Sequence, residues 1–247
     1  MESVTIPGLE LPDLPDAARV SVNAGEVTLG GYAWWQAGPA PAALLLHGWG
    51  QDASSMATPA RLLHTRGWHA VSLSSRGWLG SDGCDDYGRS GPRDTAQALD
   101  WLAAQPGVTH TVLLGFSMGG MLALLTTSTQ DTGASGVAAV SPPTDFRRVY
   151  AATTLGALPR YYDAVFTPEQ WHEGSPLTHA GTQRLPVLLV VGERDTFCPP
   201  VEGRSYAEAA GGELLSLPDM AHQPTGEEWA VIVGHVTQTF QSPPPRR

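Results

Sequence analysis

The chain has 247 residues, of which 42% are hydrophobic, a size that suits one domain with a sizeable buried core. Its 14 basic residues are all arginine and are outnumbered by 24 acidic residues, so the net charge is -10. This balance argues against a nucleic-acid-binding protein and favours a substrate that is not strongly anionic. We therefore expect a single domain over residues 1–247.

The sequence carries no recognisable targeting or cofactor-binding signal. The first seven residues lack the basic and apolar regions of a secretory signal, and no apolar run reaches the roughly 18 residues of a membrane span. We expect a cytoplasmic protein without a membrane span, and abundant Ala, Gly and Arg without lysine suggest a bacterial source. Cys84 and Cys198 lack CxxC spacing and are expected to be free thiols. The eight histidines show no metal-ligand spacing, so neither a metal nor an organic cofactor is expected, and the oligomeric state stays open.

The predicted elements begin with a surface arm. Residues up to about 17 are rich in proline and acidic groups and are expected to lie on the surface. Residues 19–22 and 27–34 alternate between apolar and polar side chains, which predicts an antiparallel hairpin with its turn at 23–26.

Beyond residue 43 the pattern alternates between strands and helices. Strands are predicted at 43–47, 69–74, 111–114, 136–141, 186–192 and 213–217, and helices at 54–66, at 92–104 and after residue 117. The first of these strands is apolar on both faces, as a strand covered by helices on both sides is. The alternation predicts an α/β fold, with a mostly parallel central sheet of about eight strands flanked by helices and joined by right-handed crossovers.

Two long stretches interrupt this alternation. Residues 76–91 are rich in Gly and Asp and predict a loop at the carboxyl edge of the sheet, where ligands of open α/β sheets bind. Residues 142–184 carry six aromatic residues other than histidine between broken helical patterns and predict a cap inserted into the domain over the site. These aromatic residues could equally anchor the insertion to the body of the protein. The proline-rich tail 242–247 is expected to be disordered.

The segment 115–120, which reads GFSMGG, lies between a predicted strand and a predicted helix. A turn this tight leaves room only for hydrogen two residues before and two residues after the serine, which explains Gly115 and Gly119. Ser117 would stand at the top of the sheet beside a helix N-terminus, whose unpaired N–H groups can meet a developing negative charge. We therefore predict Ser117 as the nucleophile and the backbone N–H of Met118 as one oxyanion donor.

A serine hydroxyl needs a base to become a nucleophile, and the base needs an orienting carboxylate. Asp195 and His222 each follow a predicted strand, so they would lie at the same edge of the sheet as Ser117. We predict His222 as the base and Asp195 as its partner. Asp145, which follows the preceding strand, and Asp219, which is close to the histidine, are the alternative acids, although Asp219 suits the turn.

The second oxyanion donor should come from the loop after an early strand. Residues 47–50, which read HGWG, fill that place, and we predict the backbone N–H of Trp49 as the donor. His47 is expected to hold this loop through hydrogen bonds of its ring. Arg147 and Arg148 in the cap could meet a carboxylate or phosphate of the substrate, or could be solvated surface residues.

Several motifs spread over nearly the whole chain resemble those of the α/β-hydrolase superfamily. They are HGWG at 47–50, SRGWLGSDG at 75–83, GFSMGG at 115–120, GERD at 192–195 and the late His222. Three further segments are similar to the catalytic domain of the prolyl oligopeptidase group and to dienelactone-hydrolase-like esterases: DTAQALDWLAAQ at 94–105, SPPTDF at 141–146 and GSPLTHA at 174–180. The peptidase group usually carries a large β-propeller, and no part of this sequence predicts one.

Together the residues and the resemblance predict a serine hydrolase that cleaves an acyl ester or thioester of a small organic substrate through an acyl-enzyme at Ser117. One alternative is a small exo- or acyl-peptidase of the prolyl oligopeptidase type. Another is a non-hydrolytic protein on the same scaffold, acting as a lyase, a cyclase or a ligand-binding protein. The substrate depends on the pocket walls, which we expect to come from 76–91 and 142–184.

Overall fold

The computed structural model describes residues 10–242, so the expectations for the first residues and for the tail beyond residue 242 lie outside it. Within these residues, eight strands form one sheet in the order β1-β2-β4-β3-β5-β6-β7-β8. Their bounds are β1 Ala18–Asn23, β2 Thr28–Trp34, β3 Ala40–Leu46, β4 His69–Leu73, β5 Val108–Phe116, β6 Gly136–Val140, β7 Val187–Gly192 and β8 Glu213–Leu217.

Strand pairing follows the sequence pattern. β1 and β2 form the predicted antiparallel hairpin, and β2 also pairs antiparallel with β4. All other neighbours in the sheet are parallel. The prediction of an α/β fold with a mostly parallel sheet of about eight strands is confirmed. β5 lies between β3 and β6, so its carboxyl end opens near the middle of the sheet edge.

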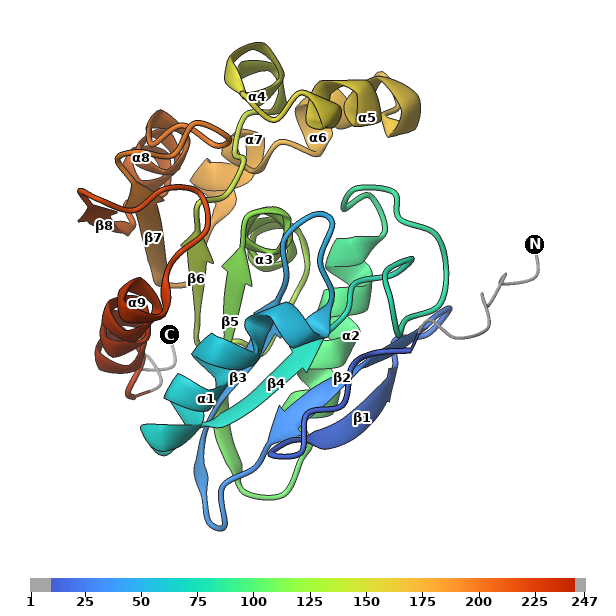
Figure 1. Ribbon diagram of the computed structural model, residues 1–247, viewed down its shortest axis with the longest axis vertical. Helices are drawn as coiled ribbons and strands as arrows, with labels where there is room; N and C mark the ends of the chain where they lie inside the picture. Colours follow the sequence, from blue (N-terminus) through green and yellow to red (C-terminus); the bar gives the residue numbers. More distant parts are fainter. Residues whose placement is uncertain (1–9, 243–247) are drawn as a thin grey trace.

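Helices lie on both faces of the sheet (Figure 1). Their bounds are α1 Ala57–Thr65, α2 Gly91–Ala103, α3 Met118–Thr129, α4 Phe146–Ala152, α5 Ala157–Val165, α6 Gln170–Glu173, α7 Pro176–His179, α8 Val201–Ala210 and α9 Gly226–Thr239, with short 3-10 helices at Ala53–Met56 and Ala180–Thr182. α1 packs against α9 on one face, and α2 packs against α3 on the other. None of the helices in residues 10–242 has the length and apolarity needed to cross a membrane.

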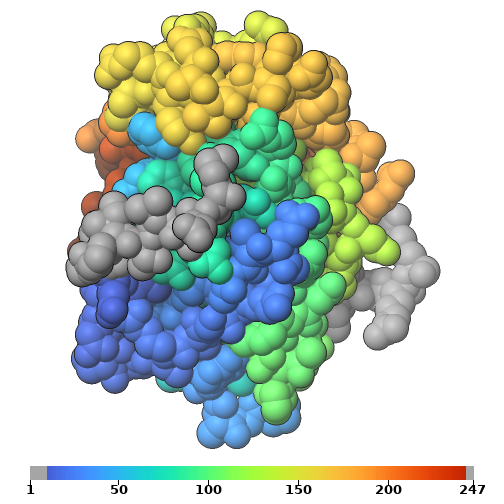
Figure 2. Space-filling view, turned by 90° about the vertical axis from the view of Figure 1, so that its right-hand side faces the viewer, coloured from blue at the N-terminus to red at the C-terminus, as the bar shows by residue number. Residues whose placement is uncertain are grey.

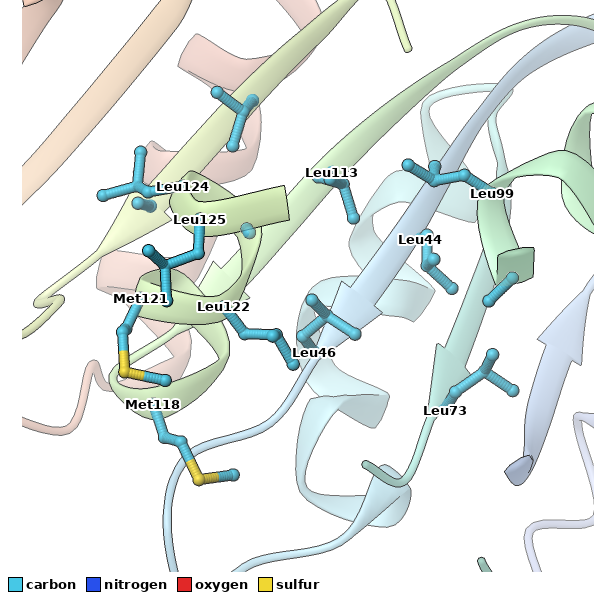
Figure 3. Packing of buried hydrophobic residues seen from close by; sticks show 14 of the residues in the cluster. Leu44, Leu46, Leu73, Leu99, Leu113, Met118, Met121, Leu122, Leu124 and Leu125 are labelled. Carbon is cyan, nitrogen blue, oxygen red and sulfur yellow. The ribbon is translucent and has the colours of Figure 1, made fainter. Parts of the chain in front are cut away.

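The core explains why β3 has no alternating pattern. Leu44 and Leu46 point to the face covered by α2 and α3, where they belong to one cluster with Leu113 and Met121 (Figure 3). Leu45 points to the opposite face and belongs to the cluster beneath α1 and α9. Because both faces of the strand are buried, every position favours an apolar residue.

The segment that joins β6 to β7 carries the short helices α4 to α7 and covers the stretch 142–184 that the sequence predicts as a cap. In Figure 1 these helices lie beyond the carboxyl ends of the central strands. Figure 2 shows this segment, yellow to orange, covering one end of the molecule above the teal and green loop 76–91. We call residues 142–184 the cap segment.

Aromatic side chains hold the cap segment together and join it to the loop 76–91. Tyr162 and Phe166 are stacked with ring centroids 4.4 Å apart, and Phe146 lies 4.9 Å from Phe166. Tyr87 of the loop lies 4.9 Å from Tyr162, and the two hydroxyls are 2.8 Å apart. The anchoring role that the sequence allows for these aromatic residues is therefore present for Tyr162 and Phe166.

Candidate active site

Ser117 lies in the tight turn between β5 and α3. Its backbone angles are φ 51° and ψ -117°, a region that an L-amino acid rarely adopts. A Cβ atom at Gly115 would clash with the carbonyl oxygen of Gly119, and one at Gly119 would clash with that of Leu46. Only glycine fits at these two positions, as the sequence predicts, and the turn lifts the Ser117 hydroxyl out of the sheet.

Three side chains from separate loops form one hydrogen-bonded line. The hydroxyl of Ser117 lies 2.9 Å from Nε2 of His222, and Nδ1 of His222 lies 2.8 Å from Oδ2 of Asp195. The side chain of Asp195 is 1% exposed and that of His222 is 17% exposed. Such a line allows the imidazole to take a proton from the hydroxyl while the carboxylate holds the Nδ1–H.

The loop after β7 fixes Asp195. The backbone N–H groups of Phe197 and Cys198 donate to Oδ1 of Asp195 at 2.8 and 2.9 Å. This leaves Oδ2 free to accept from His222. These three hydrogen bonds hold the buried carboxylate in one orientation.

The two alternative acids have other partners. Asp145 accepts hydrogen bonds from the backbone N–H groups of Arg147 and Arg148 and so caps α4. Asp219 is exposed and forms an ion pair with Arg194. Of the three candidates in the sequence, only Asp195 bonds to the histidine.

The loop 47–50 follows β3 and borders Ser117. The backbone N–H of Gly48 donates to Oε1 of Gln51 at 3.1 Å, which closes the turn. The N–H groups of Trp49 and Met118 donate no hydrogen bond to any group within residues 10–242, and Met118 is the first residue of α3. Unpaired N–H groups at a helix N-terminus are available to an anion.

His47 holds this loop from below. The backbone N–H of Ser75 donates to Nε2 of His47 at 3.0 Å, so the proton of the ring is on Nδ1, which donates to the carbonyl of Gly48 at 2.8 Å. The residue is fully buried, and this burial lowers the pKa of His47 from 6.5 to about 4. The ring is therefore neutral near pH 7, in agreement with the structural role expected for it.

A pocket of about 510 Å³ opens beside Ser117. Its walls come from the loop 47–51, the loop after β7, the loop of His222, the loop 76–91 and the cap segment. The lining residues are Gly48, Trp49, Gly50, Gln51, Tyr87, Phe116, Ser117, Leu155, Leu158, Arg194, Thr196, Phe197, Cys198, Ala221, His222 and Gln223.

Sequence reasoning identified two of these walls and missed the others. Tyr87 and Leu158 come from the two predicted stretches, whereas Arg147 and Arg148 do not line the pocket. One missed wall is the loop around Asp195, from which Arg194, Thr196, Phe197 and Cys198 line the pocket. Position next to a predicted catalytic loop was the available signal, because the residues that follow an active-site loop share its edge of the sheet.

The two cysteines differ in their exposure. Cys84 is exposed and Cys198 is buried in the pocket wall, and both are free thiols. Burial raises the pKa of the Cys198 thiol well above its usual range. No group of three or more His, Cys, Asp or Glu side chains in the part of the chain that the structure describes could hold a metal ion.

Comparison with known proteins gives a family and a fold. The sequence model of the X-Pro dipeptidyl-peptidase (S15) family matches residues 34–167, more than half of the chain, a range that includes Ser117. A search of curated proteins gave no match.

Solved structures with the same fold are numerous. The esterase Pf2001 of Pyrococcus furiosus is 21% identical, with a TM-score of 0.74 over 92% of this chain and 93% of its own. Acetyl xylan esterase 1 of Thermoanaerobacterium sp. is 17% identical, with a TM-score of 0.66 over 94% and 86%. An acylaminoacyl peptidase of Pyrococcus horikoshii is 16% identical, with a TM-score of 0.73 over 94% of this chain and 42% of its own.

At these identities the structural likeness shows the fold, whereas the match to the family model shows the family. The sheet topology and the tight turn at Ser117, which we call the elbow, agree with this fold and this family. The chain belongs to the X-Pro dipeptidyl-peptidase (S15) family and is a serine hydrolase of the α/β-hydrolase superfamily.

Proposed function

We propose that the protein hydrolyses an acyl ester or thioester of a small organic molecule through an acyl-enzyme at Ser117. The observation that carries this proposal is the hydrogen-bonded line from Ser117 through His222 to Asp195. Its position beside a pocket of about 510 Å³ supports it, because pockets of roughly 300–1,000 Å³ suit small organic ligands.

In the proposed reaction, the Ser117 oxygen attacks the acyl carbonyl carbon while His222 Nε2 takes the hydroxyl proton. Asp195 keeps the ring in the correct tautomer and stabilises its charged form. The bond from the acyl carbon to the leaving oxygen or sulfur then breaks, and His222 returns the proton to the leaving group. A water molecule, deprotonated by the same histidine, attacks the acyl-enzyme and releases the acid and free Ser117.

The negative charge on the carbonyl oxygen needs donors in the tetrahedral intermediate. We assign this role to the backbone N–H groups of Trp49 and Met118, which have no other acceptor among residues 10–242. The N-terminus of α3 adds a positive dipole end at the same place. One such donor contributes roughly 2.7–4 kcal/mol to transition-state stabilisation in other serine hydrolases.

A Ser117→Ala variant tests the proposal directly. We expect kcat for p-nitrophenyl butyrate to fall by about 10⁵-fold or more, because the nucleophile and its base act as a unit. Ser128→Ala is the matched control, since Ser128 lies in α3, the helix that follows Ser117, and its hydroxyl donates to backbone carbonyls of that helix. A fluorophosphonate should label the wild type and Ser128→Ala but not Ser117→Ala.

Two results would contradict the proposal. Hydrolysis at the wild-type rate by Ser117→Ala would remove the nucleophile assigned here. Failure of the fluorophosphonate to label the wild type would favour the non-hydrolytic alternative, in which the pocket binds a ligand or supports an elimination or cyclisation.

An exo- or acyl-peptidase is the second candidate. The observation in its favour is the family match, since that family is described by its X-Pro dipeptidyl-peptidase. Amide and ester hydrolysis share the same steps at Ser117, so the hydrogen bonds from Ser117 through His222 to Asp195 do not distinguish a peptidase from an esterase. Rates for acyl esters, acyl thioesters and aminoacyl p-nitroanilides, measured side by side, decide between the two candidates.

A further inference from the structure

The charge of the pocket lining differs from what an aminopeptidase needs. A substrate that is cleaved after an N-terminal dipeptide carries a free α-ammonium group, which must be paired once it leaves water. Among the described residues that line the pocket there is no Asp or Glu. The one residue there that is always charged is Arg194, which is itself paired with Asp219 and offers an ammonium group no counter-ion.

Three carboxylates in the segments that border the pocket, those of Asp85, Asp195 and Asp219, already have partners. Asp195 uses one oxygen for two backbone N–H groups and the other for His222. Asp85 accepts from the backbone N–H of Tyr87 and from the hydroxyl of Tyr161.

The carboxylate of Asp219 is also engaged, because it is paired with Arg194. An ammonium group in the pocket would therefore have to break an existing interaction to gain a counter-ion.

The lining is divided into a buried part and an exposed part. Phe116 and Tyr87 are 2% exposed, Leu158 is 4% exposed and Cys198 is 5% exposed. The exposed part carries the polar side chain of Gln223 together with Arg194 and Thr196.

Gln51 connects two of the loops that form the exposed part of the lining. Its Nε2 donates to Oε1 of Gln223 at 3.1 Å, which joins the loop after β3 to the loop of His222. A substrate with one apolar end and one polar end matches this division, because the apolar end leaves water and the polar end does not.

We propose that the substrate is an ester or thioester of an uncharged, apolar carboxylic acid without a free α-amino group, with the acyl chain in the buried part and the leaving group in the exposed part. This inference rests on the proposed function, because it assumes acyl transfer to Ser117. It also separates this protein from the dipeptidyl-peptidase activity by which its family is described.

A matched pair of substrates tests the inference on the wild-type enzyme. The p-nitrophenyl esters of 4-methylpentanoic acid and of leucine have the same carbon skeleton and differ only in the α-amino group. The esters differ in intrinsic reactivity, so each kcat/KM at pH 6.5 is divided by the rate constant for hydrolysis of the same ester by hydroxide. We expect this corrected kcat/KM to be about 100-fold higher for the 4-methylpentanoate ester than for the leucine ester. Along straight acyl chains, kcat/KM should rise about fourfold per methylene until the buried part is filled.

A negative charge introduced into the pocket lining provides an independent test. Leu155 lines the pocket and is half-buried, so Leu155→Glu puts a carboxylate there without burying it fully. We expect the ratio of kcat/KM for the 4-methylpentanoate ester to that for the leucine ester to fall by about tenfold or more in this variant, because the new carboxylate attracts the ammonium group. Ala152→Glu is the control, since Ala152 is exposed in the same cap segment but does not line the pocket, and it should leave the preference unchanged.

The outcomes separate the inference from the proposed function. The inference would be overturned if the wild type used the two esters equally or cleaved Gly-Pro-p-nitroanilide efficiently. Loss of that same activity in Ser117→Ala would then leave Ser117 as the nucleophile and the proposed function intact. Hydrolysis that persists in Ser117→Ala would instead overturn the proposed function, and with it the inference.

Discussion

At the scale of single residues, the three candidate acids differ in their hydrogen-bond partners. Asp145, Asp195 and Asp219 all lie near the carboxyl edge of the sheet, and the chain order alone allows each of them. Asp195 is buried and accepts from His222, whereas Asp145 caps a helix and Asp219 lies in an exposed ion pair. An exposed ion pair contributes little, roughly 0–1 kcal/mol, to stability.

We predict that Asp195→Asn lowers kcat for p-nitrophenyl butyrate by about 10⁴-fold, because an amide N–H₂ facing His222 favours the wrong tautomer of the ring. The substitution keeps the size of the side chain, so the fold should be retained, which circular dichroism can check. Asp219→Asn serves as the control and should stay within about twofold of the wild type. Near-normal activity of Asp195→Asn, or a loss confined to Asp219→Asn, would assign the acid elsewhere.

The glycines of the elbow show how much one local pattern can predict. Gly115 and Gly119 are required by two backbone contacts that the tight turn itself creates, and the spacing in the sequence was enough to infer them. The pattern that predicts the turn does not extend to Phe197 and Gln223, because pocket residues outside the turn are brought to Ser117 only by the arrangement of the strands.

At the scale of elements, two tyrosines of the cap segment each donate to an aspartate, and the two pairs differ in burial. Tyr161 of α5 donates its hydroxyl to Asp85 of the loop 76–91, and burial raises the pKa of that carboxyl group. Tyr150 of α4 donates to Asp163 at 3.2 Å on the exposed surface. The first pair joins two segments that border the pocket, whereas the second pair stays within the cap segment.

We predict that Tyr161→Phe lowers the free energy of unfolding by about 1.5–3 kcal/mol, since it removes a donor from a partly buried carboxylate. Tyr150→Phe should leave the free energy of unfolding nearly unchanged, because water replaces the lost partner. Urea denaturation with a constant m-value measures both variants. Equal effects of the two substitutions would mean that the hydrogen bond from Tyr161 to Asp85 does not stabilise the packing of the cap segment against the loop 76–91.

At the scale of the whole molecule, acid sensitivity follows from His47. Its folded-state pKa is about 4 and its reference value is 6.5, so between these pH values the unfolded chain binds a proton that the folded chain does not. Stability should therefore fall as the pH drops through this window. At about 1.36 kcal/mol for each pKa unit, the contribution of this one group reaches about 3 kcal/mol by pH 4.

A comparison of the wild type with His47→Gln measures this contribution, because all other titrating groups are common to both proteins. We predict that the free energy of unfolding lost by the wild type between pH 7 and pH 4.5 exceeds the loss in His47→Gln by about 2–3 kcal/mol. The variant should be less stable than the wild type at pH 7, since the ring bonds to Gly48 and Ser75 are altered. Parallel pH profiles for the two proteins would show that His47 is not the responsible group.

The sequence by itself determined the α/β class, the strand and helix order, the glycine requirements of the elbow and the set of residues from which the site is drawn. These properties follow from hydrophobic period, from turn chemistry and from the position of polar residues at strand ends, all of which are local. Only the tertiary structure decided which acid bonds to His222 and which side chains line the pocket. The reason is that hydrogen-bond partners and cavity walls depend on how distant segments meet, as Asp195 and His222 meet Ser117 across the edge of the sheet.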